Sequence, residues 1–148
     1  MTSGSSLSQT PTPLPRDNRG CTVCVLGSGA SGEAAAALAR SQGGTVKVFD
    51  QQPGGEALTE EDVAAHPDAL WVVSPGFAAD HPWCERIRSA GGFLIPELEY
   101  GWGSLVGETV IVTGSLGKTS MVLFAAELLR KTGRTVTVSG NIGTPVSQ

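Results

Sequence analysis

The apolar residues from position 21 onward fall into short runs separated by turns rich in glycine and proline. Runs of β-branched and other apolar residues predict buried strands at 21–26, 45–49, 69–73 and 92–95. Between them, helical spacing and capping residues predict helices at 33–42, 59–65 and 82–90. Strands that alternate with helices are typical of an α/β fold with a parallel sheet. The pattern therefore predicts a Rossmann-like domain over residues 19–103.

A second, shorter pattern begins after a glycine-rich junction at 101–107. An apolar run at 109–113 precedes a glycine loop, a helical pattern at 121–131 and another apolar run at 135–139. This order predicts one βαβ unit, which cannot by itself cover both faces of its strands. We therefore expect residues 104–148 to be the first part of a P-loop ATPase-type domain that continues in a longer protein. The polar segment 1–18 is expected to be a disordered tail.

Composition narrows the class of protein. The 148 residues carry a formal net charge of −4, which argues against a general nucleic-acid surface. Three cysteines are an odd number, which favours a reducing compartment, and Cys21 and Cys24 would point to opposite faces of one strand. We see neither an apolar run of membrane-spanning length nor a basic region followed by an apolar one at the N-terminus. A cytoplasmic location without membrane partners is expected.

The first predicted strand leads directly into residues 27–32, Gly-Ser-Gly-Ala-Ser-Gly. A G-x-G-x-x-G run between a strand and a helix is typical of nucleotide-binding βαβ units, in which Gly29 lets the backbone approach the ligand. Asp50 follows the next strand about twenty residues later, where an acid binds a ribose hydroxyl. The alternative is that the glycines only allow close packing and that Asp50 is a solvated residue at a strand end.

Residues 74–76, Ser-Pro-Gly, end the third predicted strand. The carboxyl ends of parallel strands form the edge at which α/β sheets bind ligands. Ser74, Pro75 and Gly76 are therefore expected to border the same site as the first glycine motif.

A phosphate-binding loop is predicted between the apolar run at 109–113 and the following helix. Lys118 would contribute a charge to bound phosphates, and the Thr119 hydroxyl occupies the position that ligates Mg²⁺. The match is partial, because Val112 stands where the full pattern has glycine. The alternative is a glycine-rich turn that happens to contain a lysine. The residues expected to hold ATP are Gly114, Ser115, Leu116, Gly117, Lys118, Thr119 and Ser120.

Taken together, these motifs resemble those of the Mur ligases. The resemblance rests on the order and spacing of the motifs at 27–32, 50, 74–76, 96–99, 113–119 and 140–143, the last being Gly-Asn-Ile-Gly. It covers nearly all of the chain after residue 18, and the motifs are specific jointly rather than singly.

The resemblance implies a two-step ligation. An N-terminal domain would hold UDP-N-acetylmuramoyl-L-alanine, a central domain would bind ATP and Mg²⁺, and a C-terminal domain outside this sequence would bring D-glutamate. The substrate carboxylate would become an acyl phosphate, with Lys118 as the catalytic residue that neutralises charge on the transferred phosphoryl group. Carried over to this chain, the residues that bind the UDP-substrate are Gly29, Ala30, Ser31, Asp50, Ser74, Pro75, Gly76 and Asn141. Asp50 would contact the uracil region, and Asn141 the phosphates or sugar.

This chain departs from the family's motifs at two places. Leu116 stands where the family usually has asparagine, and Gln51 and Gln52 stand where a hydroxyl and a basic residue are common. The family's remaining metal ligands and its D-glutamate domain would lie beyond residue 148, so we expect this chain alone not to ligate. Two alternatives remain: an NAD(P)-binding oxidoreductase domain, in which the Lys118 loop has no role, and a non-catalytic nucleotide-binding module.

Overall fold

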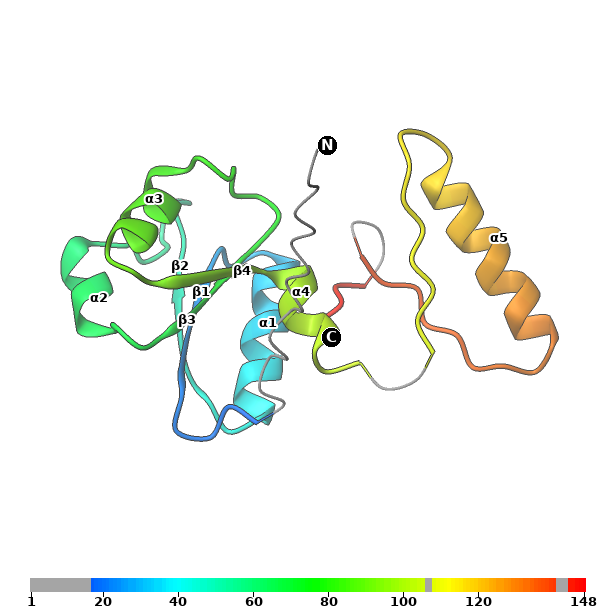
Figure 1. Ribbon diagram of the computed structural model, residues 1–148, viewed down its shortest axis with the longest axis horizontal. Coiled ribbons are helices and arrows are strands. Elements are labelled where there is room, and N and C mark those ends of the chain that lie inside the picture. The colour runs from blue at the N-terminus through cyan, green and yellow to red at the C-terminus, as the bar shows by residue number, and fades with distance from the viewer. Residues whose placement is uncertain (1–16, 106–107, 141–143) are drawn as a thin grey trace, which may run out of the picture.

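A computed structural model describes residues 17–105, 108–140 and 144–148. Four strands form one sheet, which confirms the predicted α/β class (Figure 1). They are β1 (Thr22–Leu26), β2 (Thr45–Phe49), β3 (Leu70–Val73) and β4 (Phe93–Pro96). All pair in parallel in the order β2-β1-β3-β4. The next two strands in the sequence, β2 and β3, thus lie on opposite sides of β1. This reversal of strand order creates a topological switch point between β1 and β3.

Helices cover both faces of this sheet, as a parallel sheet requires (Figure 1). Helices α1 (Ala30–Ser41) and α4 (Glu97–Trp102) lie on one face, and α2 (Glu60–Ala65) and α3 (Pro82–Ser89) lie on the other. The period of two along β1 divides the core: Val23 and Val25 pack under α1 and α4, whereas Cys24 and Leu26 pack with Trp71 under α2 and α3.

Three helices differ from the sequence prediction by more than one residue, and one of them is α5 (Lys118–Lys131), which begins before the pattern predicted at 121–131. Helix α1 begins at Ala30 rather than at residue 33, so the last three residues of the glycine motif form its first turn. Helix α4 was not predicted at all, because it is short and contains Gly101, an unfavourable residue in a helix interior. The glycine is needed there: a Cβ at position 101 would lie 2.6 Å from backbone atoms of Val146 and Ser147.

Residues 1–16 of the predicted tail lie outside the described residues, but Asn18, which we assigned to the tail, is only 1% exposed. Its Nδ2 donates to Gln42 Oε1 at 2.7 Å and to the Tyr100 hydroxyl at 2.6 Å. The Gln42 amide in turn donates to Ser104 Oγ at 2.7 Å. Asn18 therefore belongs to the folded domain, and a polar side chain of this kind gives no sign of burial in the sequence.

The second unit is only partly built. Helix α5 (Lys118–Lys131) is present, but the strands predicted at 109–113 and 135–139 are wrong: among the described residues beyond β4, only an isolated bridge joins Ser139 and Thr144. A strand requires hydrogen bonds to at least one neighbouring strand, and none of the first domain's strands pairs with these two runs.

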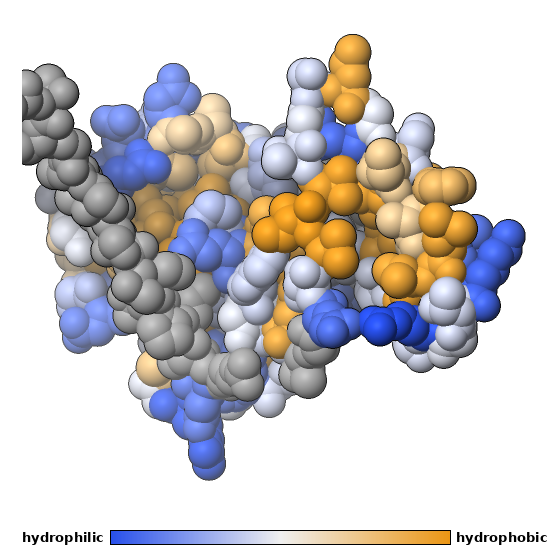
Figure 2. Space-filling model, turned by 45° about the vertical axis from the view of Figure 1, so that its right-hand side comes forward, coloured by the Kyte–Doolittle hydropathy of each residue, from blue (hydrophilic) through white to orange (hydrophobic). Residues whose placement is uncertain are grey.

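The exposed surface of the second unit is correspondingly apolar. Within the described part of the chain, α5 contacts no other helix or strand. Figure 2 shows apolar side chains gathered on this side of the molecule. The large apolar residues exposed here are Val110, Ile111, Leu116, Met121, Leu123, Phe124 and Leu128.

The chain nevertheless returns to the first domain. The Glu97 carboxylate, which is 4% exposed, accepts a hydrogen bond of 2.8 Å from the backbone N–H of Ser147. Helix α4 therefore anchors the segment that follows α5. Over residues 17–105, 108–140 and 144–148, none of the helices has both the length and the apolar character needed to cross a membrane.

Candidate functional site

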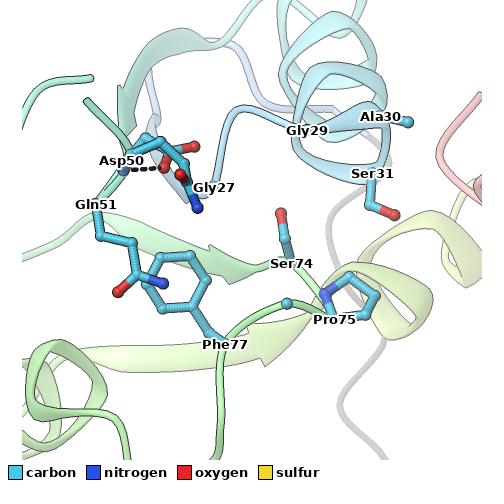
Figure 3. Close-up of a pocket in the computed structure, with 11 residues that line it drawn as sticks. Gly27, Gly29, Ala30, Ser31, Asp50, Gln51, Ser74, Pro75 and Phe77 are labelled. Carbon is cyan, nitrogen blue, oxygen red and sulfur yellow. Dashed lines mark hydrogen bonds between the residues drawn. The ribbon is translucent and has the colours of Figure 1, made fainter. Parts of the chain in front are cut away.

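An open cleft of about 270 Å³ lies at the carboxyl ends of β1, β2 and β3, beside the switch point (Figure 3). Seven of the eight residues predicted to bind the UDP-substrate line it: Gly29, Ala30, Ser31, Asp50, Ser74, Pro75 and Gly76. The eighth, Asn141, lies outside the described residues. Three segments that are distant in the sequence are thus brought to one edge of the sheet.

The glycine motif forms the wall of the cleft on the side of α1. Gly27 adopts φ +104°, and its N–H donates to Phe49 O at 2.7 Å, so the loop turns sharply against the end of β2. Gly29 precedes α1, and no side chain caps the helix. The free N–H groups of the first turn, together with the positive end of the helix dipole, therefore form a site suited to a diphosphate.

Asp50 holds this loop in place. Its Oδ2 accepts from the Ser28 N–H at 2.5 Å and from the Ser28 hydroxyl at 2.6 Å, and its Oδ1 accepts from the Gln52 N–H at 2.8 Å. Oδ2 has then used both of its acceptor positions, and Oδ1 retains one. These hydrogen bonds lower the pKa of Asp50 from its ordinary value of 3.8, and the bond from the Ser28 hydroxyl makes the largest contribution. Asp50 thus joins two walls of the cleft and can contact a ligand through one oxygen.

Replacing Asp50 with asparagine should lower the free energy of unfolding by about 1 kcal/mol at neutral pH, because one amide N–H would then face another donor. A pKa lowered by folding stabilises the protein above pH 3.8 and ceases to do so as the pH falls through the folded-state value. The difference in the free energy of unfolding between wild type and Asp50→Asn, measured with urea, should therefore be constant above about pH 5 and shrink below pH 4. Asp68→Asn, at an exposed carboxylate, is the control; an equal loss there would contradict this role.

The Ser74 hydroxyl is the cleft's unpaired polar group. Ser74 is 8% exposed, and among the described residues its buried Oγ has no hydrogen-bond partner. In Figure 3 this oxygen points between Gly27 and Ser31. A buried hydroxyl without a partner costs free energy, which a ligand oxygen or nitrogen in the cleft would recover.

Sequence reasoning missed four lining residues: Gly27, Gln51, Gln52 and Phe77. Gln51 and Gln52 were noted as departures from a family pattern that would alter the contacts with uracil, but they were not assigned to the site. Phe77 follows Ser-Pro-Gly in a loop, and a single aromatic residue in a loop carries no signal of its own. Its position next to 74–76, at the end of a strand, was the one clue available.

The predicted phosphate loop has a backbone geometry that is compatible with a bound anion. Gly117 precedes α5 in the left-handed region at φ +76°, and no side chain caps this helix either. The Lys118 ammonium donates to the carbonyl oxygen of Gly114, and it lies 3.4 Å from that of Ser115. The lysine thus lies over the loop, near the position where phosphates would be bound. Leu116 at its tip is 91% exposed.

Thr119 is the second residue of α5, and its hydroxyl could ligate Mg²⁺. No group of three His, Cys, Asp or Glu side chains suited to a metal occurs in the described part of the chain. Mg²⁺ commonly takes one or two protein ligands and completes its shell with water and phosphate oxygens, so a single threonine hydroxyl is compatible with a nucleotide-bound magnesium.

The fold is that of a Rossmann-like domain, and a family profile described as "NAD(P)-binding Rossmann-like domain" matches residues 25–83. Over a longer stretch the chain is similar to UDP-N-acetylmuramoylalanine–D-glutamate ligases. It is 32% identical to that of Streptococcus uberis and 34% to that of Streptococcus pyogenes, in each case over 85% of this chain and 31% of the relative. With the enzyme of Koribacter versatilis the identity is 33% over 87% of this chain and 32% of the relative.

The resemblance to the Mur ligases is therefore confirmed. The names of these relatives specify D-glutamate as one of the two groups that are joined. The chain spans about a third of the length of these relatives.

Proposed function

We propose that this chain is the uridine-nucleotide-binding domain, followed by the start of the ATP-binding domain, of a ligase that adds D-glutamate to UDP-N-acetylmuramoyl-L-alanine. The observation that carries the proposal is the cleft. It gathers residues from three separate motifs at the switch point, and the same motifs are the ones that resemble the Mur ligases. The location proposed for this step of cell-wall synthesis is the cytoplasm.

Each wall of the cleft would make a different contact with the ligand. The N–H groups of Gly29, Ala30 and Ser31 would bind the diphosphate, and Asp50 would hold the glycine loop in the conformation that presents them. The buried Ser74 hydroxyl would bind the same ligand. We assign Asn141 to the substrate's phosphates or sugar.

The second unit would bind ATP. When bound, ATP provides the phosphoryl group that activates the substrate carboxylate. Lys118 would exchange its loop carbonyls for phosphate oxygens, and the residues from Gly114 to Ser120 would cradle them with backbone N–H groups. Thr119 would take Mg²⁺. D-Glutamate would be brought by residues that this sequence does not contain, so we expect the chain by itself not to form product.

An NAD(P)-dependent oxidoreductase remains the alternative that the Rossmann-like profile suggests. A dinucleotide site uses its acid at the end of the second strand to receive ribose hydroxyls. Here three hydrogen bonds from the protein already occupy the Asp50 carboxylate. This arrangement favours a ligand held by the loop's N–H groups over one held by the acid.

The test is a calorimetric titration of this chain with UDP-N-acetylmuramoyl-L-alanine, with NADH as the comparison ligand. We expect saturable binding of the uridine compound and none of NADH. Binding of NADH alone would overturn the proposal in favour of the oxidoreductase. An assay in which this chain alone formed ligated product from ATP, the uridine substrate and D-glutamate would overturn the expectation of inactivity.

A further inference from the structure

The side chain of Gln51 in the cleft is hydrogen-bonded to His81, which precedes α3. Gln51 follows β2 directly, and its Oε1 lies 3.0 Å from Nε2 of His81. The other ring nitrogen, Nδ1, lies 3.2 Å from the backbone N–H of Trp83 and caps α3. One imidazole thus connects the first turn of a helix to the wall of the cleft.

The helix cap determines which ring nitrogen carries the proton. A backbone N–H can only donate, so Nδ1 of His81 must be the acceptor, and the neutral ring then carries its proton on Nε2. This Nε2–H donates to the amide oxygen of Gln51. If the amide were flipped, its NH₂ group would face a second donor. His81 therefore holds Gln51 with its oxygen toward the ring and its two N–H donors free.

The imidazole is itself held by aromatic neighbours. It meets Phe77 edge to face, with ring centroids 4.7 Å apart and planes at 76°, and it meets Trp83 at 5.5 Å and 87°. Phe77 also lines the cleft. Figure 3 shows Gln51 and Phe77 at the same end of the cleft, with the amide nitrogen on the side of Phe77. An apolar ring and a pair of fixed donors therefore occur together, as a site for a planar base requires.

We propose that His81 is a positioning residue that makes this cleft select uracil over cytosine, a proposal that rests on the uridine-nucleotide function above. The Gln51 donors pair with an exocyclic carbonyl oxygen. Both exocyclic groups of uracil are carbonyl oxygens, so it offers an acceptor whichever of them meets the amide. In cytosine one of the two is an amino group, which opposes these donors. Phe77 contacts either base and does not discriminate.

The test variant is His81→Asn, because asparagine is among the best helix-capping residues and is too short to hold Gln51. Helix α3 keeps its cap, while the Gln51 amide becomes free to flip and offer its oxygen to cytosine. UDP and CDP are titrated separately into wild type and variant. The ratio of the CDP to the UDP dissociation constant should fall roughly three- to tenfold, the value of one hydrogen bond, while the affinity for UDP changes less.

Gln51→Leu tests the same preference with His81, the residue that caps α3, still in place. It should lower the ratio to the same extent, and the double variant should lower it no further, because both residues act through one amide. An unchanged ratio in His81→Asn, with UDP still bound, would overturn this inference and leave the uridine-nucleotide function standing. Wild type that binds neither nucleotide would overturn both.

Discussion

Replacing Gly32 with alanine should destabilise the first domain by about 3 kcal/mol or more, the upper range for overpacking a core. A Cβ at this position would lie 1.8 Å from the carbonyl oxygen of Gly27 and 3.0 Å from Ser74 Oγ. The first of these is a backbone atom, so β1 and α1 would have to move apart. At roughly 4–8 °C per kcal/mol for a domain of this size, the melting temperature should fall by roughly 12–24 °C.

Gly29→Ala is the matched control in the same motif. Gly29 has an ordinary φ of −72°, and a Cβ there would meet nothing within 4 Å. It should melt within about 3 °C of wild type, since substitutions without new contacts change little. Its binding of UDP-N-acetylmuramoyl-L-alanine should weaken, because a methyl group would stand where the diphosphate approaches the backbone. Calorimetric melting and ligand titration of both variants separate packing from binding; a normal melting temperature for Gly32→Ala would contradict the packing argument.

Replacing Lys118 with alanine should weaken ATP binding by about 2–3 kcal/mol, or roughly thirty- to 150-fold, the value of hydrogen bonds between charged groups. Lys118 is exposed and donates only to loop carbonyls in this structure, so its loss should leave the melting temperature unchanged. The measurement is a titration of ATP with Mg²⁺ into each protein.

Lys131→Ala supplies the control for charge alone. Lys131 lies at the other end of α5, where it is 3.9 Å from Glu127, and removing it changes the net charge by the same amount. It should bind ATP as wild type does. Equal ATP affinity for Lys118→Ala and wild type would show that the phosphate loop has been misread. In the oxidoreductase alternative, Lys118→Ala would leave NAD binding untouched.

The first domain could be predicted because its signals are local and agree with one another. Helix α2 is an example: a helix was predicted at 59–65, and in the structure Thr59 caps it in a full capping box with Asp62. The glycine motif and Ser-Pro-Gly could be placed at one edge because parallel strands bring their carboxyl ends together. Gly29, Asp50 and residues 74–76 follow from that rule, whereas Ala30 and Ser31 were assigned through the family resemblance.

The remainder depends on contacts that are distant in the sequence. Asn18 is buried only because Gln42 and Tyr100 meet it from two other elements. Gln51 gained a role only when the fold brought His81 beside it. The runs at 109–113 and 135–139 have the composition of buried strands, but strand pairing requires neighbours that these residues do not have here.

Helix α4 holds the chain at two places that lie on either side of the phosphate loop. Tyr100 on α4 shares the Asn18 network, whose last bond is the 2.7 Å one from Gln42 to Ser104, and Glu97 holds Ser147. The stretch between Ser104 and Ser147 is therefore bonded to the first domain at both of its ends, Ser104 to Gln42 after α1 and Ser147 to Glu97 on α4. A single cut in the backbone within the phosphate loop would leave each half still attached to the first domain. The entropic cost of closing this loop is met by the folding of the first domain, independently of any nucleotide.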